Sequence, residues 1–213
     1  SLHQLVRQYS YEKLDYAGDS EAISVAHAHY FADFMNEHTV DIKGLRQIGG
    51  LMDITADFDN ITEAWYHIVD TSDFSALDKM MGGIVIYCEM KAQYQICEDL
   101  FRYAVSRLLS HTNNETDLRL NHLRVCWIRT WLLPERNPIP DSLVQQLKLC
   151  HKLAREQDNH LTIAWCLFAW GEFLRIDQNV NSEGTQNPVG FYLQSHQEFE
   201  NLGHLYGVIR VLR

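Results

Sequence analysis

Two pairs of side chains in this sequence have the right types for catalysis or metal binding, but their spacing argues against both. Cys150 is followed directly by His151, which together suggest a nucleophile and its base. Neighbouring residues of a helix diverge by about 100°, so the imidazole cannot reach the thiol. His27 and His29 point to nearly opposite sides of a predicted helix and cannot ligate one ion. Neither pair predicts a reactive centre.

The remaining candidate groups also favour a structural interpretation. The carboxylates at 57 and 59, and at 98 and 99, lack the oxygen-donor run and central glycine of a calcium loop, so we assign them to solvated helix faces. No GxxxxGK[ST], GxGxxG or GxSxG motif occurs, and the glycine pair in "MMGGIV" (80–85) is typical of close helix packing. We therefore expect no catalytic residue, no metal and no cofactor.

Composition indicates an ordered protein that neither binds nucleic acid nor spans a membrane. The 213 residues are 46% hydrophobic and carry a formal net charge of -10, which repels phosphate backbones. No apolar run approaches the ~20 residues of a membrane span, and no signal peptide precedes the first helix. The five cysteines lie in apolar helical runs without a CxxC, which predicts reduced core thiols and a cytoplasmic location: Cys88, Cys97, Cys126, Cys150 and Cys166.

Apolar residues recur at helical spacing along nearly the whole chain, which predicts an all-α fold. Capping residues support several of the predicted helix starts, for example Asn187 followed by Pro188. Proline-rich 134–141 and polar 177–187 are predicted loops. The predicted helices are 2–16, 20–38, 45–69, 73–88, 92–110, 115–133, 141–157, 160–175, 188–202 and 205 to the end.

An internal repeat is visible in the second half. The segment 150–167 aligns with 195–212 at a constant offset of 45, which places Cys150 on Ser195 and Ala154 on Phe199. Helix 160–175 then fits the first helix of a tetratricopeptide repeat, with Gly171 as the small residue that admits the second helix. We expect a right-handed superhelix of antiparallel, tetratricopeptide-like helix pairs.

This pattern also gives the candidate binding residues. Four side chains of the first helix fall on positions that line the concave groove of tetratricopeptide folds, where aromatic residues and arginine are common anchors for a peptide, protein or small-molecule effector. The same stripe of residues fits a buried seam between helices equally well, so both interpretations stay open. The candidates are Trp165, Phe168, Glu172 and Arg175.

The first seventy residues resemble a known arrangement in bacterial STAND-type signalling ATPases. In that family a stretch similar to "LVRQYSYEKL" closes a winged-helix domain, a "HAHYF" helix follows, and a "DN" helix opens the tetratricopeptide sensor region. The matching residues here are Leu5, Arg7, Gln8, Tyr9, Glu12, Lys13, Leu14, His27, Ala28, Tyr30, Phe31, Asp59, Asn60 and Ala64.

The resemblance implies that 1–16 end an upstream winged-helix-like domain or linker helix, and that 17–213 form the repeat domain. The repeat pattern predicts that this domain is cut short at its C-terminus, because the last repeat lacks its second helix. It also implies an ATPase module upstream and a non-enzymatic, effector-sensing role for this segment. A free-standing scaffold of the same fold for protein–protein interaction is the alternative, and a helical enzyme with an unrecognised site is the third possibility.

Overall fold

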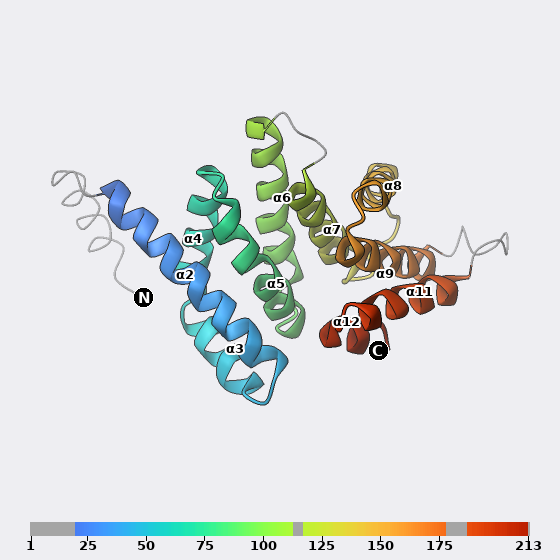
Figure 1. Cartoon of the computed structure of the whole chain (residues 1–213), viewed down its shortest axis with the longest axis horizontal. Coiled ribbons are helices and arrows are strands. Elements are labelled where there is room, and N and C mark those ends of the chain that lie inside the picture. Colours follow the sequence, from blue (N-terminus) through green and yellow to red (C-terminus); the bar gives the residue numbers. More distant parts are fainter. Residues whose placement is uncertain (1–19, 113–116, 178–186, 213) are drawn as a thin grey trace. The chain divides into compact units, whose positions relative to one another are not determined.

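A computed structural model describes residues 20–112, 117–177 and 187–212, and every regular element in these ranges is a helix (Figure 1). The all-α prediction is confirmed for this part of the chain. The predicted helix over 2–16 and its assignment to an upstream domain lie outside the described residues. The helices are α2 (Ser20–Lys43), α3 (Gln47–Ala56), α4 (Phe58–Asp70), α5 (Phe74–Met90), α6 (Tyr94–Thr112), α7 (Leu118–Leu132), α8 (Asp141–Glu156), α9 (His160–Ile176), α11 (Pro188–Asn201) and α12 (Leu205–Val211).

The predicted single helix over 45–69 is wrong, because α3 and α4 are separate helices that meet at Asp57. The backbone there leaves the helical region, with φ -109° and ψ 13°. Asn60 donates a side-chain hydrogen bond of 3.0 Å to the Asp57 carboxylate, and short polar side chains that bond locally compete with helix geometry. Backbone bonds from Asp57 to Asp53 and from Ile61 to Asp57 continue across the junction, so no loop intervenes.

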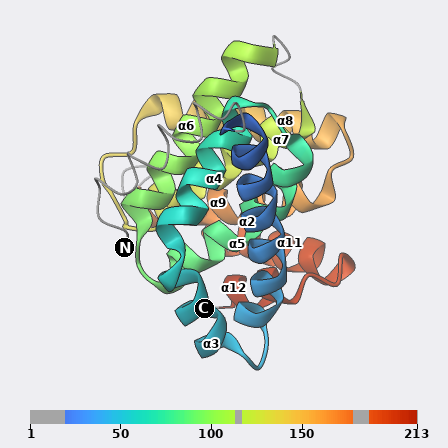
Figure 2. The same ribbon diagram turned by 90° about the vertical axis from the view of Figure 1, so that its left-hand side faces the viewer.

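The chain divides into two compact units, residues 1–83 and 84–213. In the first unit α2 packs against α3 and α4, and α2 lies beside α4 in both views (Figures 1 and 2). The residues that α2 buries recur at helical spacing, as expected for one face of a helix: Ala28, Phe31, Ala32, Met35 and Ile42.

One glycine of the "MMGGIV" pair confirms the prediction of close helix packing. A Cβ at Gly83 would clash with Thr39 Oγ1 and would lie only 2.7 Å from Met35 Cε, so α5 approaches α2 too closely for any side chain there. Gly82 faces open space instead, because a Cβ added there would meet nothing within 4 Å. Only the second glycine of the pair is therefore required by packing.

In the second unit each helix packs on the next, from α6 through α12, and α7 also contacts α9 directly. A hydrophobic core runs between these helices, with Trp165 and Phe199 near its centre at a ring separation of 4.5 Å. As predicted, Asn187 caps α11 through a 3.0 Å bond from the Val189 N–H. None of the described helices is both long and apolar enough to cross a membrane.

One backbone turn recurs four times between helices in the part of the chain that the structure describes. Its central residue has a left-handed backbone, stands two positions after one helix and stands two positions before the next helix. That residue's N–H bonds to the carbonyl three positions earlier, and the following N–H bonds to the carbonyl five positions earlier, which is a Schellman motif. The four central residues are Ser72, Ala92, Asp158 and Gly203.

The last two of these turns are 45 residues apart, which is the offset predicted from the sequence. The caps that follow them also match, because Asn159 Oδ1 accepts from the Thr162 N–H and His204 Nδ1 accepts from the Gly207 N–H, each at 3.0 Å. Both segments therefore fold as the same helix–turn–helix. The aligned buried positions include Cys150 with Ser195 and Ala154 with Phe199.

Candidate ligand-binding site

The four predicted groove residues all lie on α9 and share one face, but they divide between core and pocket. Trp165 and Phe168 are 4% and 3% exposed, and both belong to the hydrophobic core. Phe168, Glu172 and Arg175 line one pocket of about 400 Å³, which we call the α9–α12 pocket. The full lining is Tyr94, Leu133, Glu135, Phe168, Glu172, Arg175, Tyr192, Arg210 and Val211.

A set of ion pairs and hydrogen bonds fixes one rim of this pocket. Arg175 donates to Glu135 at 2.9 Å and to Glu172 at 2.7 Å, and the Tyr192 hydroxyl donates to the other oxygen of Glu172 at 2.7 Å. These carboxylates raise the pKa of Arg175, while burial and the bond to Glu172 raise the pKa of Tyr192. Arg175 therefore holds the rim in place and has its donors engaged by protein carboxylates.

A buried polar network lies beside the pocket and joins α5, α7 and α12. Glu89 accepts from Arg129 at 2.8 Å and from the Tyr206 hydroxyl, and it pairs with Arg210 at 3.5 Å. The side chains of Glu89 and Arg129 are only 7% and 3% exposed. Burial, followed by the charge of Glu89, raises the pKa of Tyr206, so its hydroxyl stays a donor.

The network reaches α9 through aromatic rings. The guanidinium carbon of Arg129 lies 3.4 Å from the centre of the Trp165 ring, and that of Arg210 lies 5.2 Å from the Phe168 ring. Both geometries are those of cation–π contacts. Trp165 is thus the buried support for the network, and Phe168 lies between the network and the pocket.

Arg210 is the side chain of this group that can meet a ligand. Its Nε faces Glu89, whereas its two terminal nitrogens have no hydrogen-bond or ion-pair partner among the described residues. Glu89 also pairs with Arg129, so Arg210 shares this carboxylate with a second arginine at the pocket wall. This arrangement favours an anionic group or a carbonyl oxygen at that point, with apolar contact to Phe168.

The described residues offer little for covalent or metal chemistry. All five cysteines are buried, and burial raises the pKa of Cys126 and Cys150 to about 12, so neither thiol forms a nucleophilic thiolate at neutral pH. Within the described ranges no three His, Cys, Asp or Glu side chains come together as metal ligands would. The prediction that the cysteines are core thiols is confirmed.

Sequence reasoning did not identify Glu89, Arg129, Tyr206 and Arg210. Arg129 had a visible signal, because it is a charged residue within the apolar run "CWIRTWLL".

Comparison with protein-family models, with curated proteins and with solved structures gives no significant match.

Proposed function

We propose that this chain is the effector-sensing helical-repeat domain of a STAND-type signalling ATPase, and that its effector binds in the α9–α12 pocket. One observation carries the proposal. Three residues selected from the repeat pattern, Phe168, Glu172 and Arg175, line a single pocket together with an incompletely paired arginine. The resemblance of the first seventy residues supports the STAND assignment.

The effector is a short peptide or small molecule with an anionic group. Its anionic group pairs with the outer nitrogens of Arg210, and its apolar part contacts Phe168 and the ring of Tyr192. The volume of about 400 Å³ accommodates a few side chains or one small metabolite rather than a folded surface. A pocket this size, on helices that also carry a polar network, suits recognition more than scaffolding.

Sensing follows from the position of Arg210 between pocket and network. A ligand that engages Arg210 weakens its pairing with Glu89 on α5 and so alters how firmly α12 packs. The ligand shifts the balance between two packings only by its difference in affinity for them. The signal to the upstream ATPase is that change in packing.

The proposal also includes a tetratricopeptide-like arrangement of the helices. Helices α5, α7, α9 and α12 are the first helices of successive pairs in a right-handed, tetratricopeptide-like superhelix, and their shared face is its concave side. Support comes from the recurring Schellman turn and from the close approach of Gly171 to Tyr192, where an added Cβ would lie 2.5 Å from the ring.

The test is a selection of random seven-residue peptides displayed on phage, with the full chain as bait. Peptides are selected on the wild-type chain alone, and their binding is then measured on an Arg210→Met variant and on an Arg102→Met variant, which is the matched control because Arg102 lies on α6 outside the pocket lining. We expect selected peptides to carry acidic groups and to lose binding to Arg210→Met alone. Selected peptides that bind both variants equally would contradict the proposed site.

The STAND assignment has its own test. The gene on both sides of this segment should encode a nucleotide-binding P-loop upstream, and the chain alone should hydrolyse no ATP. Measurable ATP turnover by the purified chain would contradict the non-catalytic role. A full-length reading frame without a P-loop would favour the free-standing scaffold instead.

A further inference from the structure

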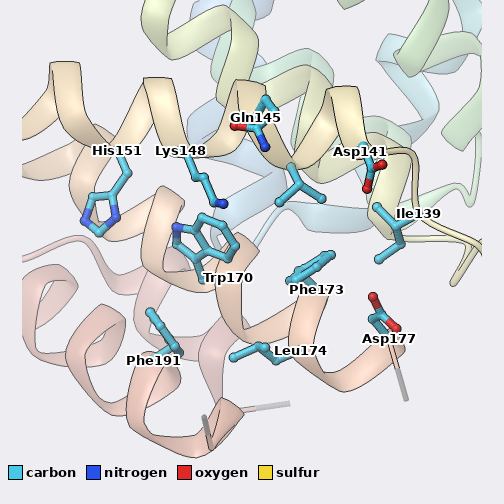
Figure 3. A pocket seen from close by; sticks show the side chains of 11 residues that line it. Ile139, Asp141, Gln145, Lys148, His151, Trp170, Phe173, Leu174, Asp177 and Phe191 are labelled. Atoms are coloured by element: carbon cyan, nitrogen blue, oxygen red, sulfur yellow. The ribbon is translucent and has the colours of Figure 1, made fainter. Parts of the chain in front are cut away.

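A second pocket lies on α9, in the groove that α9 forms with α8, and it shares no residue with the α9–α12 pocket (Figure 3). We call it the α8–α9 pocket. Its volume of about 620 Å³ falls in the usual range for small-ligand sites. It is lined by Ile139, Asp141, Val144, Gln145, Lys148, His151, Trp170, Phe173, Leu174, Asp177 and Phe191.

Aromatic rings form the apolar part of this pocket. Trp170 meets Phe173 edge to face at a ring separation of 5.6 Å and lies 6.3 Å from Phe191 on α11. Phe173 is nearly buried, whereas Trp170 is half-buried and keeps part of its ring accessible. Such a surface binds an apolar or aromatic side chain of a ligand.

Charged groups stand at opposite ends of the apolar part. Figure 3 shows Asp141 and Asp177 on one side of Phe173 and Lys148 and His151 on the other side, with Trp170 next to Lys148. Lys148 follows Asp141 by seven residues on α8, which is about 10 Å along the helix axis. The pocket is therefore electrically polar along its length.

The basic end has donors available for a ligand. Lys148 has no ion-pair partner among the described residues. His151 accepts a hydrogen bond at Nε2 from Arg155 at 3.1 Å, so its neutral ring carries the proton on Nδ1. Burial and the charge of Arg155 lower the pKa of His151, which keeps the ring neutral near pH 7. An ammonium group and an imidazole N–H can thus both donate at this end.

The repeat itself does not require these polar residues. At the offset of 45, Lys148 corresponds to Leu193 and Gln145 to Gly190 on α11, the equivalent helix. The fold accommodates an apolar or a small residue at these positions, which are exposed on α8, so packing within the repeat does not dictate the polar side chains of α8. These side chains are therefore available to contact a ligand in the pocket.

We infer that the α8–α9 pocket binds a free zwitterionic peptide of about three residues with an apolar central side chain. Its carboxylate pairs with Lys148 and accepts from His151, its terminal amine pairs with Asp141 and Asp177, and its side chain contacts Trp170. Three extended residues span about 10 Å, which matches the separation of the two charged ends. This site is independent of the effector pocket proposed above.

The test is isothermal titration calorimetry of the full chain with the tripeptide alanyl-phenylalanyl-alanine. Two modified peptides each remove one charge: the amidated form lacks the carboxylate, and the acetylated form lacks the amine. We expect each modification to weaken binding about tenfold, the scale of a desolvated charge pair. Absence of binding at millimolar peptide overturns the inference, as does equal affinity for all three peptides.

Variants place the peptide in this pocket. Lys148→Met should weaken binding of the free peptide about tenfold and leave the affinity of the amidated peptide unchanged, because the lost partner is already absent there. Lys152→Met is the matched control, since Lys152 lies one turn further along α8 and pairs with Glu156 at 3.7 Å outside the pocket. Asp141→Asn should likewise weaken binding of the free peptide and leave the affinity of the acetylated peptide unchanged, because that peptide lacks the amine that Asp141 would pair with. An equal loss for free and amidated peptide in Lys148→Met would contradict the assigned orientation.

Discussion

Arg129 lies with its guanidinium carbon 3.4 Å from the centre of the Trp165 ring, and the same guanidinium donates a 2.8 Å hydrogen bond to Glu89. The arginine is 3% exposed, so water compensates almost none of its charge. One aromatic face and one carboxylate therefore hold it, and these come from α9 and α5. This relationship connects the predicted groove helix to the rest of the second unit.

We predict that this pair is strongly coupled. Arg129→Met should lower the free energy of unfolding by about 3 kcal/mol, because the buried Glu89 carboxylate then loses its ion pair with the Arg129 guanidinium. The double variant Glu89→Gln with Arg129→Met should lose less than the sum of the single losses, by at least about 1 kcal/mol. Urea denaturation of the four proteins in the cycle measures this coupling.

The matched control is the exposed pair of Arg102 with Asp99. Those side chains are 59% and 44% exposed, and breaking their 2.6 Å contact should change stability by less than about 1 kcal/mol. Coupling of Arg129 to Glu89 no larger than this control would mean that the network contributes nothing to holding α5 and α7 together.

Gly171 should not tolerate a methyl group. An added Cβ would lie 2.5 Å from the Tyr192 ring, so Gly171→Ala forces α11 to move and should destabilise the protein by about 1 to 3 kcal/mol despite the better helix propensity of alanine. Gly190→Ala, where a Cβ meets nothing within 4 Å, should be neutral or slightly stabilising. Thermal unfolding compares the two, and equal effects would contradict the close approach.

The two equivalent turns give a reciprocal pair of substitutions. Asp158 adopts φ 53° and Gly203 adopts φ 64°, the left-handed region that favours glycine. Asp158→Gly should stabilise the protein by about 0.5 to 1 kcal/mol, and Gly203→Asp should destabilise it by a similar amount. Changes of the same sign in urea midpoints would show that the two turns are not equivalent.

Stability should fall as the pH drops from neutrality because of His122. Burial, with the charges of Arg129 and His204, lowers the pKa of His122 to about 4. Between pH ~6.5 and ~4 the unfolded chain therefore binds a proton that the folded chain excludes, and the free energy of unfolding falls by up to about 3 kcal/mol.

The pH effect of His122 is separable from that of other groups. Burial also lowers the pKa of His151, which acts in the same direction, whereas carboxylates raise the pKa of the exposed His160 and act in the opposite one. His122→Gln should reduce the loss of stability between pH 7 and pH 5, measured by urea denaturation at each pH. An unchanged pH dependence in this variant would exclude His122 as the main cause.

Helix positions follow well from the sequence where apolar spacing is regular and caps are present. Helix α9 starts at His160 as predicted because Asn159 caps it, and α11 starts at Pro188 after Asn187. The break at Asp57 was missed because apolar spacing continues across it, and only a local side-chain bond with Asn60 marks the junction.

The site was predictable only in part, for a physical reason. Residues on one helix share a face at fixed spacing, so Phe168, Glu172 and Arg175 could be grouped from sequence. The contacts of Glu89 with Tyr206 and Arg210 join positions more than a hundred residues apart, and no local pattern encodes them. The burial of Trp165 likewise depends on Arg129 and Phe199, which cover it from other helices.

The most direct test of the proposed function is the affinity of one acidic peptide, chosen by the phage selection, for the wild-type chain and for Arg210→Met and Arg102→Met. Isothermal titration calorimetry gives the three dissociation constants, and urea denaturation shows whether both variants stay folded. We predict about tenfold or greater weakening for Arg210→Met and no change for Arg102→Met. The same dissociation constant for all three folded proteins would contradict the α9–α12 pocket as the effector site.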